Sequence, residues 1–546
     1  MKQAQALDIF KTGQNIFLTG AAGSGKTYIL NQYIKYLREK NLNVSVTATT
    51  GIAATHLNGL TIHSWSGLGV KDDLRGSDFD DLLKKRHLRR NILGTDVLII
   101  DEISMLHAHQ LDLVNQICQA FRQNLKPFGG LQLIMAGDFF QLPPIAKGEE
   151  RAKIVVESDI WNAMDLAVCY LDEQYRQADS RFIQILNEIR KNNVSLESRE
   201  LLLNRFHRPL AYQIEPTKLY THNIDVDAIN SLELEKISGP AKSYQMQSKG
   251  NQVLSQILQK GCLAPERLVL KIGAKVMFVK NNFELGVVNG TVGEVVDFDE
   301  DNYPIVKTSH GETVVAAPAD WLIEEDGRVR AEIRQIPLRL AWAITVHKSQ
   351  GLSLDLAEVD LSKAFVPGMG YVALSRVRSL QGLRLVGLND LALTVDANIL
   401  ALDEKFIALS KQTENYWQSL STEEQLARHQ LFARETSLKP RKSKKVAGRN
   451  KEKTKALIAQ KMSLPAIAQE LGFALGTIIR HIENLLAAGE KIDIDYLLPG
   501  ESERQEITAA FADLGMDYLA PVFEYLNGIY SFETLRLVRA WLMTKR

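Results

Sequence analysis

Runs of apolar residues near the N-terminus follow two patterns, and each predicts a different kind of element. The run NIFLTG at 15–20 is short and continuous, which is typical of a buried strand, whereas KTYILNQYIKYLREK at 26–40 has apolar residues at helical spacing. Two later runs, DVLII at 96–100 and LQLIMA at 131–136, also predict buried strands, and polar residues follow each of them. This succession of strands and helices favours an α/β fold.

The second half of the chain contains a region of short alternating segments. LKIGAKVMFVKNNFELGVVNGTVGEVVDFD at 270–299 alternates apolar and polar residues, and Asn-Gly and Gly turns interrupt the alternation. Such short strands joined by tight turns predict a small β-barrel inserted in the surrounding domain.

The C-terminal region has the apolar spacing of a helix-turn-helix, with a turn at Gly472. Its expected core residues are Ile467, Ala468, Leu471, Ile478, Ile479 and Ile482. The second helix opens on Ala474, Leu475 and Gly476, whereas a base-reading helix needs polar side chains there. We therefore prefer an accessory or partner-docking role for residues 456–546 over base-specific recognition.

A basic segment precedes this region and lacks apolar periodicity. It carries eight cationic residues against the single Glu452: Lys439, Arg441, Lys442, Lys444, Lys445, Arg449, Lys451 and Lys453. This composition predicts that 401–455 is first helical and then a solvated basic linker, which could act as a weak DNA tether.

Composition narrows the class of protein without naming its function. The 546 residues are 45% hydrophobic and 24% charged, which is typical of a globular protein. Because 65 Lys and Arg residues balance 65 Asp and Glu residues, the net charge argues neither for nor against binding of nucleic acid. Three scattered cysteines, Cys118, Cys169 and Cys262, exclude a disulfide framework and a cysteine zinc site. Because no run approaches the roughly 18 apolar residues of a membrane span, we expect a soluble cytoplasmic protein, nucleoid-associated in a bacterium.

The stretch GAAGSGKT at 20–27 fits the phosphate-binding pattern G-x-x-x-x-G-K-[ST] between the predicted strand and helix. There, backbone N–H groups wrap a β-phosphate at the start of a helix. We predict that Lys26 reaches the β and γ oxygens and that Thr27 holds Mg²⁺, and we prefer this interpretation over an accidental glycine turn. The expected nucleotide-binding residues are Gly20, Gly23, Ser24, Gly25, Lys26 and Thr27.

Two predicted strands end in residues that suit phosphate chemistry. Asp101 and Glu102 follow the strand at 96–100, where an aspartate can hold the Mg²⁺ shell and a glutamate can orient and deprotonate the attacking water. Gln141 follows the strand at 131–136 and is placed to sense the γ-phosphate. A loop residue making only local hydrogen bonds is an equally good interpretation of Gln141.

Two later segments resemble the fifth and sixth motifs of superfamily 1 helicases. They are PLRLAWAITVHKSQGLSLD at 337–355 and GYVALSRVRSLQGLRL at 370–385. TATTGIAATHLNGLTIHSWSGLG resembles the DNA-contacting motifs, LDEQYRQADSRFIQILNEIR the fourth motif, and NLKPFGGLQLIMAGDFFQLPPI a segment peculiar to the Pif family of 5′-to-3′ DNA helicases. The resemblance covers about residues 1–400, with every motif in order.

The resemblance implies two RecA-like domains, 1–172 and 173–400, with ATP between them and single-stranded DNA across the top. It implies a DNA-facing insert at about 63–92, an SH3-like barrel at about 268–335, and an all-α C-terminal domain similar to that of some RecQ-type helicases. Arg176 and Arg376 would reach the γ-phosphate from the second domain. Gln3 stands where the family reads adenine, with Gln5 as the neighbouring alternative.

The family resemblance and the chemistry of single-strand binding together suggest a set of DNA-contacting residues. Such tracks combine phosphate contacts with aromatic stacking platforms, although packing is an equally good role for each aromatic residue. One departure is Met369, where many family members carry glutamine. The expected DNA-contacting residues are Thr50, Gly51, His63, Trp65, Phe140, His347, Lys348, Ser349 and Gln350.

The pattern as a whole predicts an ATP- and Mg²⁺-dependent DNA helicase that moves 5′ to 3′ on single-stranded or tailed duplex DNA in genome maintenance. A protein partner at the C-terminal domain is also expected, and a membrane partner is not. One alternative is a RecD-like helicase, which lacks the KPFGGLQLI segment. A nucleotide-switched DNA-binding regulator is the second, and its ATP hydrolysis would not respond to single-stranded DNA.

Overall fold

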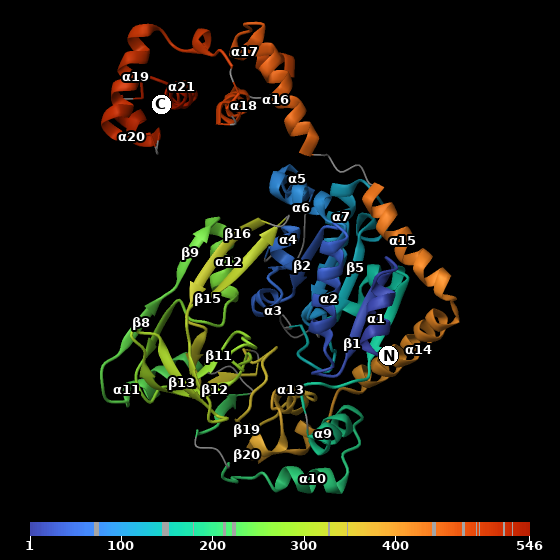
Figure 1. The fold of residues 1–546 in the computed structure, drawn as a ribbon. Helices are drawn as coiled ribbons and strands as arrows, with labels where there is room; N and C mark the ends of the chain where they lie inside the picture. Colours follow the sequence, from blue (N-terminus) through green and yellow to red (C-terminus); the bar gives the residue numbers. More distant parts are fainter. Residues whose placement is uncertain are drawn as a thin grey trace. The chain divides into compact units, whose positions relative to one another are not determined.

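The computed structural model describes residues 1–69, 76–144, 152–177, 179–210, 214–220, 225–325, 328–346, 348–438, 444–471, 475–487, 489–490, 492–516, 519–526 and 528–545. The chain divides into two compact units, Met1–Thr436 and Ser437–Arg546 (Figure 1).

The first domain of the larger unit is built on a six-stranded parallel sheet of order β3-β2-β4-β5-β1-β6. Its central strands are fully buried, which explains why they are continuous apolar runs in the sequence. The three strands predicted from those runs are confirmed. The strands are β1 (Asn15–Gly20), β2 (Val44–Ala48), β3 (Leu60–Thr61), β4 (Val97–Asp101), β5 (Gln132–Ala136) and β6 (Leu166–Leu171).

Helices cover this sheet, and the predicted helix after the phosphate loop is confirmed as α2, whose apolar positions are buried. The helices are α1 (Gln3–Phe10), α2 (Lys26–Glu39), α3 (Gly51–His56), α4 (Ile62–Ser66), α5 (Gly76–Lys84), α6 (Arg86–Gly94), α7 (Ala108–Arg122) and α8 (Asp159–Ala163), with short 3₁₀ turns at Ile103–Met105, Pro127–Gly130 and Val155–Glu157. Helices α4, α5 and α6 occupy the insert expected at about 63–92.

The second domain has a four-stranded parallel sheet of order β18-β7-β19-β20. Its strands are β7 (Thr217–Tyr220), β18 (Ala343–Thr345), β19 (Ala357–Leu361) and β20 (Leu383–Leu388). Its helices are α9 (Ser180–Arg190), α10 (Leu196–Leu203), α11 (Val226–Glu235) and α13 (Met369–Leu374), with 3₁₀ turns at Leu380–Gly382 and Asp390–Leu393.

Antiparallel strands interrupt the second domain, as the alternating region predicts. The first sheet has the strand order β14 (Thr313–Val315), β13 (Pro304–Thr308), β12 (Val292–Phe298), β11 (Lys275–Phe278) and β17 (Leu338–Leu340). The second has the order β15 (Ala319–Glu325), β16 (Arg328–Gln335) and β9 (Gln247–Gly250). The third is the pair of β8 (Lys242–Gln245) with β10 (Arg267–Leu270). The described strands thus form three sheets over a longer range than 268–335, and a closed SH3-like barrel is not confirmed. Helix α12 (Gln252–Gly261) packs on β16 and on α3.

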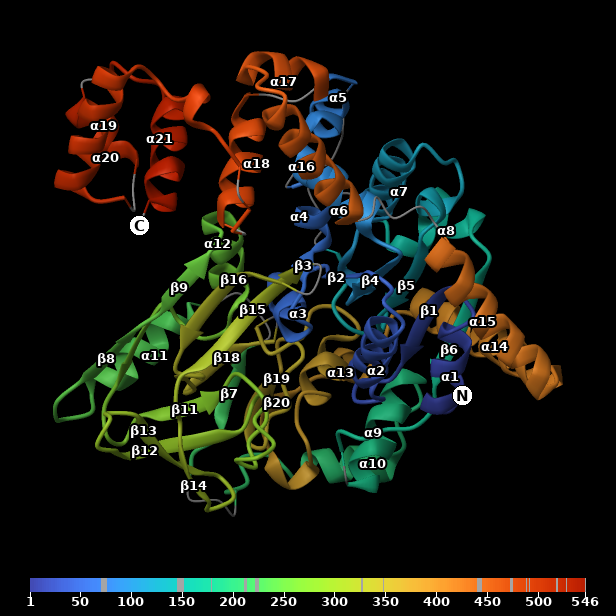
Figure 2. The same cartoon turned by 45° about the horizontal axis from the view of Figure 1, so that its top comes forward.

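Helix α14 (Ala397–Ser419) and all but the last two residues of α15 (Thr422–Leu438) belong to the larger unit, which therefore extends past the boundary expected at about 400. They run along the outer side of the first domain in both views (Figures 1 and 2). Helix α14 covers the edge strand β6, and the Ser410 hydroxyl accepts a hydrogen bond from the Tyr170 backbone N–H at 2.9 Å. The buried Phe406 ring lies 4.8 Å from that of Phe17. Sequence spacing does not reveal the packing of α14 on β6, because the contacting residues are more than 200 positions apart in the chain.

A chain that ends at Thr436 is expected to fold and to keep its nucleotide chemistry, whereas one that ends at Val395 should not fold stably. The shorter chain exposes the β6 edge and the apolar surface beneath Phe406. Thermal unfolding and ATP hydrolysis of both chains would check this. Equal stability would show that α14 only lies against the domain.

Two neighbouring residues of α14 provide the matched comparison in the full chain. Phe406→Ala should lower the free energy of unfolding by about 3–5 kcal/mol, since it empties a buried aromatic site. Ile407→Ala, whose side chain is 47% exposed, should change it little.

The smaller unit is all helical, as predicted, and Ile467, Ile478, Ile479 and Ile482 are buried in it. It contains α16 (Lys444–Ala459), α17 (Leu464–Leu471), α18 (Leu475–Ala487), α19 (Glu501–Leu514), α20 (Leu519–Tyr525) and α21 (Phe532–Thr544), with a 3₁₀ turn at Asp495–Leu497.

The second half of the expected basic linker is helical instead, because α16 begins at Lys444. Its C-terminal turns pack inward, where Ile458 is buried and the Thr454 hydroxyl lies 2.9 Å from Nδ1 of His481. Lys439, Arg441 and Lys442 lie outside the described residues. Across the described parts of the chain, no helix is both long and apolar enough to cross a membrane.

Candidate nucleotide and DNA site

The phosphate loop joins the carboxyl end of β1 to the first turn of α2. Gly23 and Gly25 have φ of 86° and 87°, a region that favours glycine. A Cβ at Gly23 would lie 2.4 Å from Cβ of Arg176, and one at Gly25 would lie 2.1 Å from Nε2 of Gln3. Only glycine therefore lets these two side chains approach the loop.

Lys26 and Ser24 have no anionic partner inside this loop. The Lys26 ammonium donates to the backbone oxygens of Gly20 at 2.8 Å and Ala21 at 3.2 Å. Burial lowers the pKa of Lys26, and the nearby carboxylates of Asp138 and Glu102 partly oppose that shift. Within the described residues, the buried Ser24 hydroxyl has no hydrogen-bond partner. A phosphate group would supply the negative charge that Lys26 lacks and the hydrogen-bond partner that Ser24 lacks.

Asp101 and Glu102 stand at the end of β4, the strand next to β5 and β2 in the sheet. The Asp101 carboxylate accepts the Glu102 backbone N–H at 2.8 Å, and Glu102 has a φ of 54° that turns its side chain into the cavity described next. Burial, and then the charge of Glu102, raises the pKa of Asp101 to about 7. A cation beside these carboxylates would relieve that repulsion, and Thr27 and Asp101 offer oxygen ligands suited to Mg²⁺.

Two arginines of the second domain lie beside the phosphate loop, and one of them, Arg376, bonds to Gln141 of the first domain. Arg376, which is fully buried, donates from Nη2 to the Gln141 side-chain oxygen at 2.9 Å. Arg176 donates to the Ser375 backbone oxygen at 3.3 Å. Burial, together with repulsion from Arg376, lowers the pKa of Arg176 to about 9. The two guanidinium groups therefore form a site that an anion would stabilise, and the interdomain bond of Gln141 goes beyond local loop contacts.

One cavity of about 810 Å³ extends from the phosphate loop toward the antiparallel insert. Its lining includes predicted nucleotide residues and predicted DNA residues, and it draws on both parallel domains. The predicted residues that line it are Gly23, Gly25, Lys26, Thr27, Thr50, Asp101, Glu102, Gln141, Arg176, Lys348, Gln350 and Arg376.

Gln3 and Gln5 of the N-terminal helix make different contacts. The Gln3 side-chain amide donates to the Ser24 backbone oxygen at 3.1 Å, whereas the Gln5 side chain accepts the Lys2 N–H at the start of its own helix. The exposed ring of Tyr175 lines the cavity near Gln3, and the motif pattern did not single it out. Its position in YRQ, one residue before Arg176, was the available signal.

Three of the predicted DNA-contacting residues, Thr50, Lys348 and Gln350, line the cavity. Thr50 caps α3 and lines the cavity, while Gly51 lies against Gly261, where a Cβ would meet Cα at 2.8 Å. Lys348 pairs with the exposed Asp227 at 2.7 Å, a surface pair that a phosphate could replace at little cost. The buried Gln350 amide nitrogen has no partner among the described residues. His63 is half-buried, and His347 lies outside the described residues.

Three of the expected DNA contacts are wrong for this structure. Trp65 and Phe140 are each 3% exposed, so neither offers a ring face to a base. Trp65 packs in the core of the first domain, and Phe140 lies under the Arg190 guanidinium at 4.0 Å. Ser349 is fully buried and donates to the Val346 backbone oxygen at 2.8 Å. For both aromatic residues the packing alternative was the correct one.

The antiparallel insert contributes cavity residues that the sequence did not indicate. Lys280 lies 5.0 Å from the Trp321 ring, and both line the cavity. Asn289, from the Asn-Gly turn of the insert, lies 3.0 Å from Nε2 of His56 on α3. Burial lowers the pKa of His56 to about 4, so its neutral ring accepts this bond at neutral pH. Only folding brings the insert to α3, so no local pattern marks these residues.

The fold and the site define a phosphate-loop nucleotide-binding protein in which a second parallel α/β domain supplies two arginines. Residues 2–200 match the family model "PIF1-like helicase", residues 254–298 match "DNA helicase Pif1, 2B domain", and residues 450–539 match "Helix-turn-helix domain". The ATP-dependent DNA helicase Pif1 of Psychrobacter sp. is 39% identical over 99% of this chain and 100% of its own length. The chain belongs to the PIF1-like helicase family, and this membership decides against the RecD-like alternative.

Solved structures agree with this family. Bacteroides sp. Pif1 in complex with ADP-AlF4 is 30% identical, with a TM-score of 0.65 over 75% of this chain and 97% of that one. Bacteroides Pif1 bound to single-stranded DNA has the same identity, with a TM-score of 0.51 over 74% of this chain and 96% of that one.

Proposed function

We propose that this protein is an ATP-dependent DNA helicase that moves 5′ to 3′ along single-stranded DNA and unwinds tailed duplexes during genome maintenance. One observation carries the proposal: a single cavity is lined by the phosphate loop, by both interdomain arginines and by Thr50, Lys348 and Gln350. The nucleotide and the single-stranded DNA would therefore both contact the second domain. The structures of Bacteroides Pif1 in complex with ADP-AlF4 and bound to single-stranded DNA support both ligands.

Hydrolysis of ATP would rest on residues of the first domain. Lys26 would exchange its two backbone acceptors for β and γ oxygens, and the loop N–H groups would hold the β-phosphate. Thr27 and Asp101 would hold Mg²⁺, which neutralises phosphate charge when bound. Glu102, whose buried Oε2 has no partner in the described residues, would orient and deprotonate the attacking water.

The second domain would complete the site only when it closes on the first. Arg176 and Arg376 would stabilise the charge that develops on the γ-phosphate, as arginine fingers do. Gln141, bonded to Arg376, would report the state of the γ-phosphate to the second domain. Gln3 and Tyr175 would bind the adenine edge and face. Domain closure and strand movement would then be one event.

The C-terminal unit would serve as an accessory module or dock a protein partner. Its second helix opens on small and apolar residues, which suits packing better than base reading. The domains would be 1–172, 173 to about 395 and 437–546, with α14 and α15 belonging to the motor, and the protein would work in the cytoplasm on DNA.

Partial duplexes with one single-stranded tail test the direction of movement. With ATP, we expect unwinding of a 5′-tailed duplex and little unwinding of a 3′-tailed or blunt duplex of the same sequence. ATP hydrolysis should rise strongly with single-stranded DNA. Preference for the 3′ tail would overturn the polarity, and hydrolysis indifferent to DNA would favour the nucleotide-switched regulator.

A further inference from the structure

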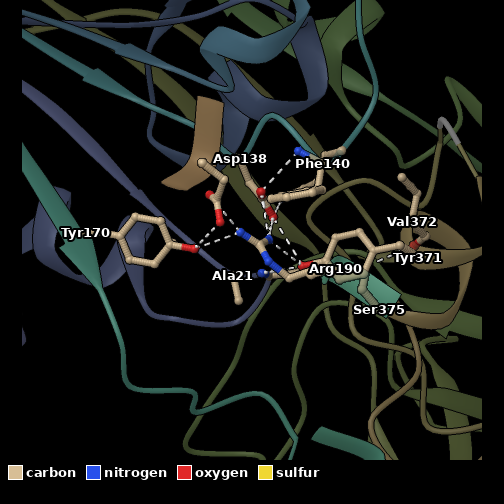
Figure 3. A network of polar contacts seen from close by, with 12 residues as sticks. Ala21, Asp138, Phe140, Tyr170, Arg190, Tyr371, Val372 and Ser375 are labelled. Atoms are coloured by element: carbon tan, nitrogen blue, oxygen red, sulfur yellow. Dashed lines mark hydrogen bonds and ion pairs between the residues drawn. The ribbon is translucent and has the colours of Figure 1, made fainter. Parts of the chain in front are cut away.

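Arg190, the last residue of α9, is the centre of a buried polar network (Figure 3). Its Nη1 donates to both carboxylate oxygens of Asp138, at 2.9 and 3.0 Å, and to the Tyr371 hydroxyl at 2.9 Å. Its Nη2 donates to the Tyr170 hydroxyl at 2.9 Å and to Asp403 at 3.3 Å. The two terminal nitrogens of one guanidinium group thus bond in two directions, toward the phosphate loop and away from it.

The network joins parts of the chain that come from both parallel domains. Asp138 follows β5 of the first domain, and Tyr170 is on β6. Arg190 and Tyr371 belong to α9 and α13 of the second domain, and Asp403 to α14. Any change in the angle between the domains must therefore either alter these hydrogen bonds or move the bonded residues together.

Asp138 places a negative charge directly behind the nucleotide site. Burial by itself would raise the pKa of Asp138, but the charges of Arg190 and Lys26 outweigh it and hold that pKa below its ordinary value. The carboxylate therefore stays ionised. Without Arg190, Asp138 would keep its hydrogen bonds to Phe140, Gln141 and Tyr371 but lose its ion-pair partner, so its charge would compete with ATP phosphates for Lys26 and would repel them.

Tyr371 extends the network to the phosphate loop itself. Its hydroxyl accepts the Ala22 backbone N–H at 3.2 Å and lies 3.3 Å from Oδ2 of Asp138, to which it can donate. Arg376 lies two residues after the end of α13, and its Nε donates back to the Val372 backbone oxygen of that helix at 3.1 Å. The contacts of the Tyr371 hydroxyl therefore help to position α13 and, through Val372, Arg376.

We propose that Arg190 is a positioning residue for ATP: it neutralises Asp138 behind the phosphate loop and holds Tyr371 against Ala22, and with Tyr371 the helix α13 to which Arg376 is bonded. Arg190 does not line the nucleotide cavity, so it acts through these two residues. The inference rests on the proposed ATP-dependent function. It adds a residue whose positive charge offsets that of Asp138, so that the site does not repel phosphate.

A charge-pair rescue tests the electrostatic part. In the full chain, Arg190→Gln should weaken binding of a fluorescent, slowly hydrolysed ATP analogue by roughly tenfold or more, since it leaves Asp138 unpaired. Asp138→Asn added to Arg190→Gln should restore the affinity to near the wild-type value. Arg199→Gln, which removes an exposed arginine–aspartate pair of α10, is the matched control and should change nothing.

The outcomes separate positioning from support of the fold. If the double variant binds the analogue as weakly as Arg190→Gln, the lost contacts matter rather than the charge, and the proposal is overturned. Nucleotide affinity is measured without DNA, so it is independent of whether the wild-type protein unwinds duplexes.

A second variant keeps the test decisive if Arg190→Gln does not fold. Tyr371→Phe keeps the buried ring and removes only the hydroxyl. We expect kcat for DNA-stimulated hydrolysis to fall by roughly threefold to tenfold, the scale of one or two hydrogen bonds, while KM for ATP changes little. An unchanged kcat would remove Tyr371, and with it the link to Arg376, from the proposal.

Discussion

Lys26→Ala should lower ATP hydrolysis by about a thousandfold or more, the largest effect we expect of any single substitution. The Lys26 ammonium donates to two backbone oxygens of the loop, and phosphate oxygens could take their place. Binding to single-stranded DNA should remain, because Thr50, Lys348 and Gln350 are untouched. Steady-state hydrolysis and DNA binding by fluorescence anisotropy measure the two properties.

Two further variants sharpen this result. Lys35→Ala lies on the exposed face of the same helix and should hydrolyse ATP at the wild-type rate. Glu102→Gln should bind ATP and hold it without turnover, which separates the base from the phosphate ligand. A loss of DNA binding by Lys26→Ala on the same scale as its loss of hydrolysis would show that the nucleotide and strand sites are not separable.

Arg376→Ala should lower DNA-stimulated hydrolysis by roughly a thousandfold, the scale of an arginine finger. Arg376 comes from the second domain and touches Gln141 of the first, so its charge reaches the γ-phosphate only in the closed form. Nucleotide affinity should change little, because Lys26 and the loop remain. Single-turnover hydrolysis with and without single-stranded DNA, together with analogue binding, makes the measurement.

Arg376→Lys is the conservative comparison. Lysine keeps the charge but not the planar fork that donates at once to Gln141 and to a phosphate, so we expect only partial recovery. If Arg376→Ala instead weakens ATP binding while kcat is preserved, Arg376 contacts bound ATP but does not stabilise the transition state of hydrolysis.

The local sequence pattern was sufficient to predict an element wherever residues close together in the chain determine which side chains are buried. A run such as 131–136 can only be a central strand, because apolar side chains on both faces require cover on both faces. The glycine loop after 15–20 predicted its own conformation, since the positive φ of Gly23 and Gly25 suits no other residue. The apolar stripe of 475–487 likewise predicted a packed helix in the C-terminal unit.

Residue type did not tell which aromatic or polar side chains face a ligand. Trp65 and Phe140 have the chemistry of stacking platforms, yet the cores around them bury both rings. Lys280 and Trp321 carried no signal, because the insert meets the cavity only after β11 and β15 have found their partners. A side chain's exposure depends on contacts that sequence spacing does not encode.

The sequence by itself determined the phosphate loop, the parallel strands and the family, because each depends on residues close together in the chain. Tertiary structure alone decided that α14 covers β6 and that Arg190, Asp138 and Tyr371 meet behind the phosphate loop. Asp138 and Tyr371 are 233 residues apart. Their contact exists only because closing the two domains buries charges that must then find partners, and no local pattern carries that requirement.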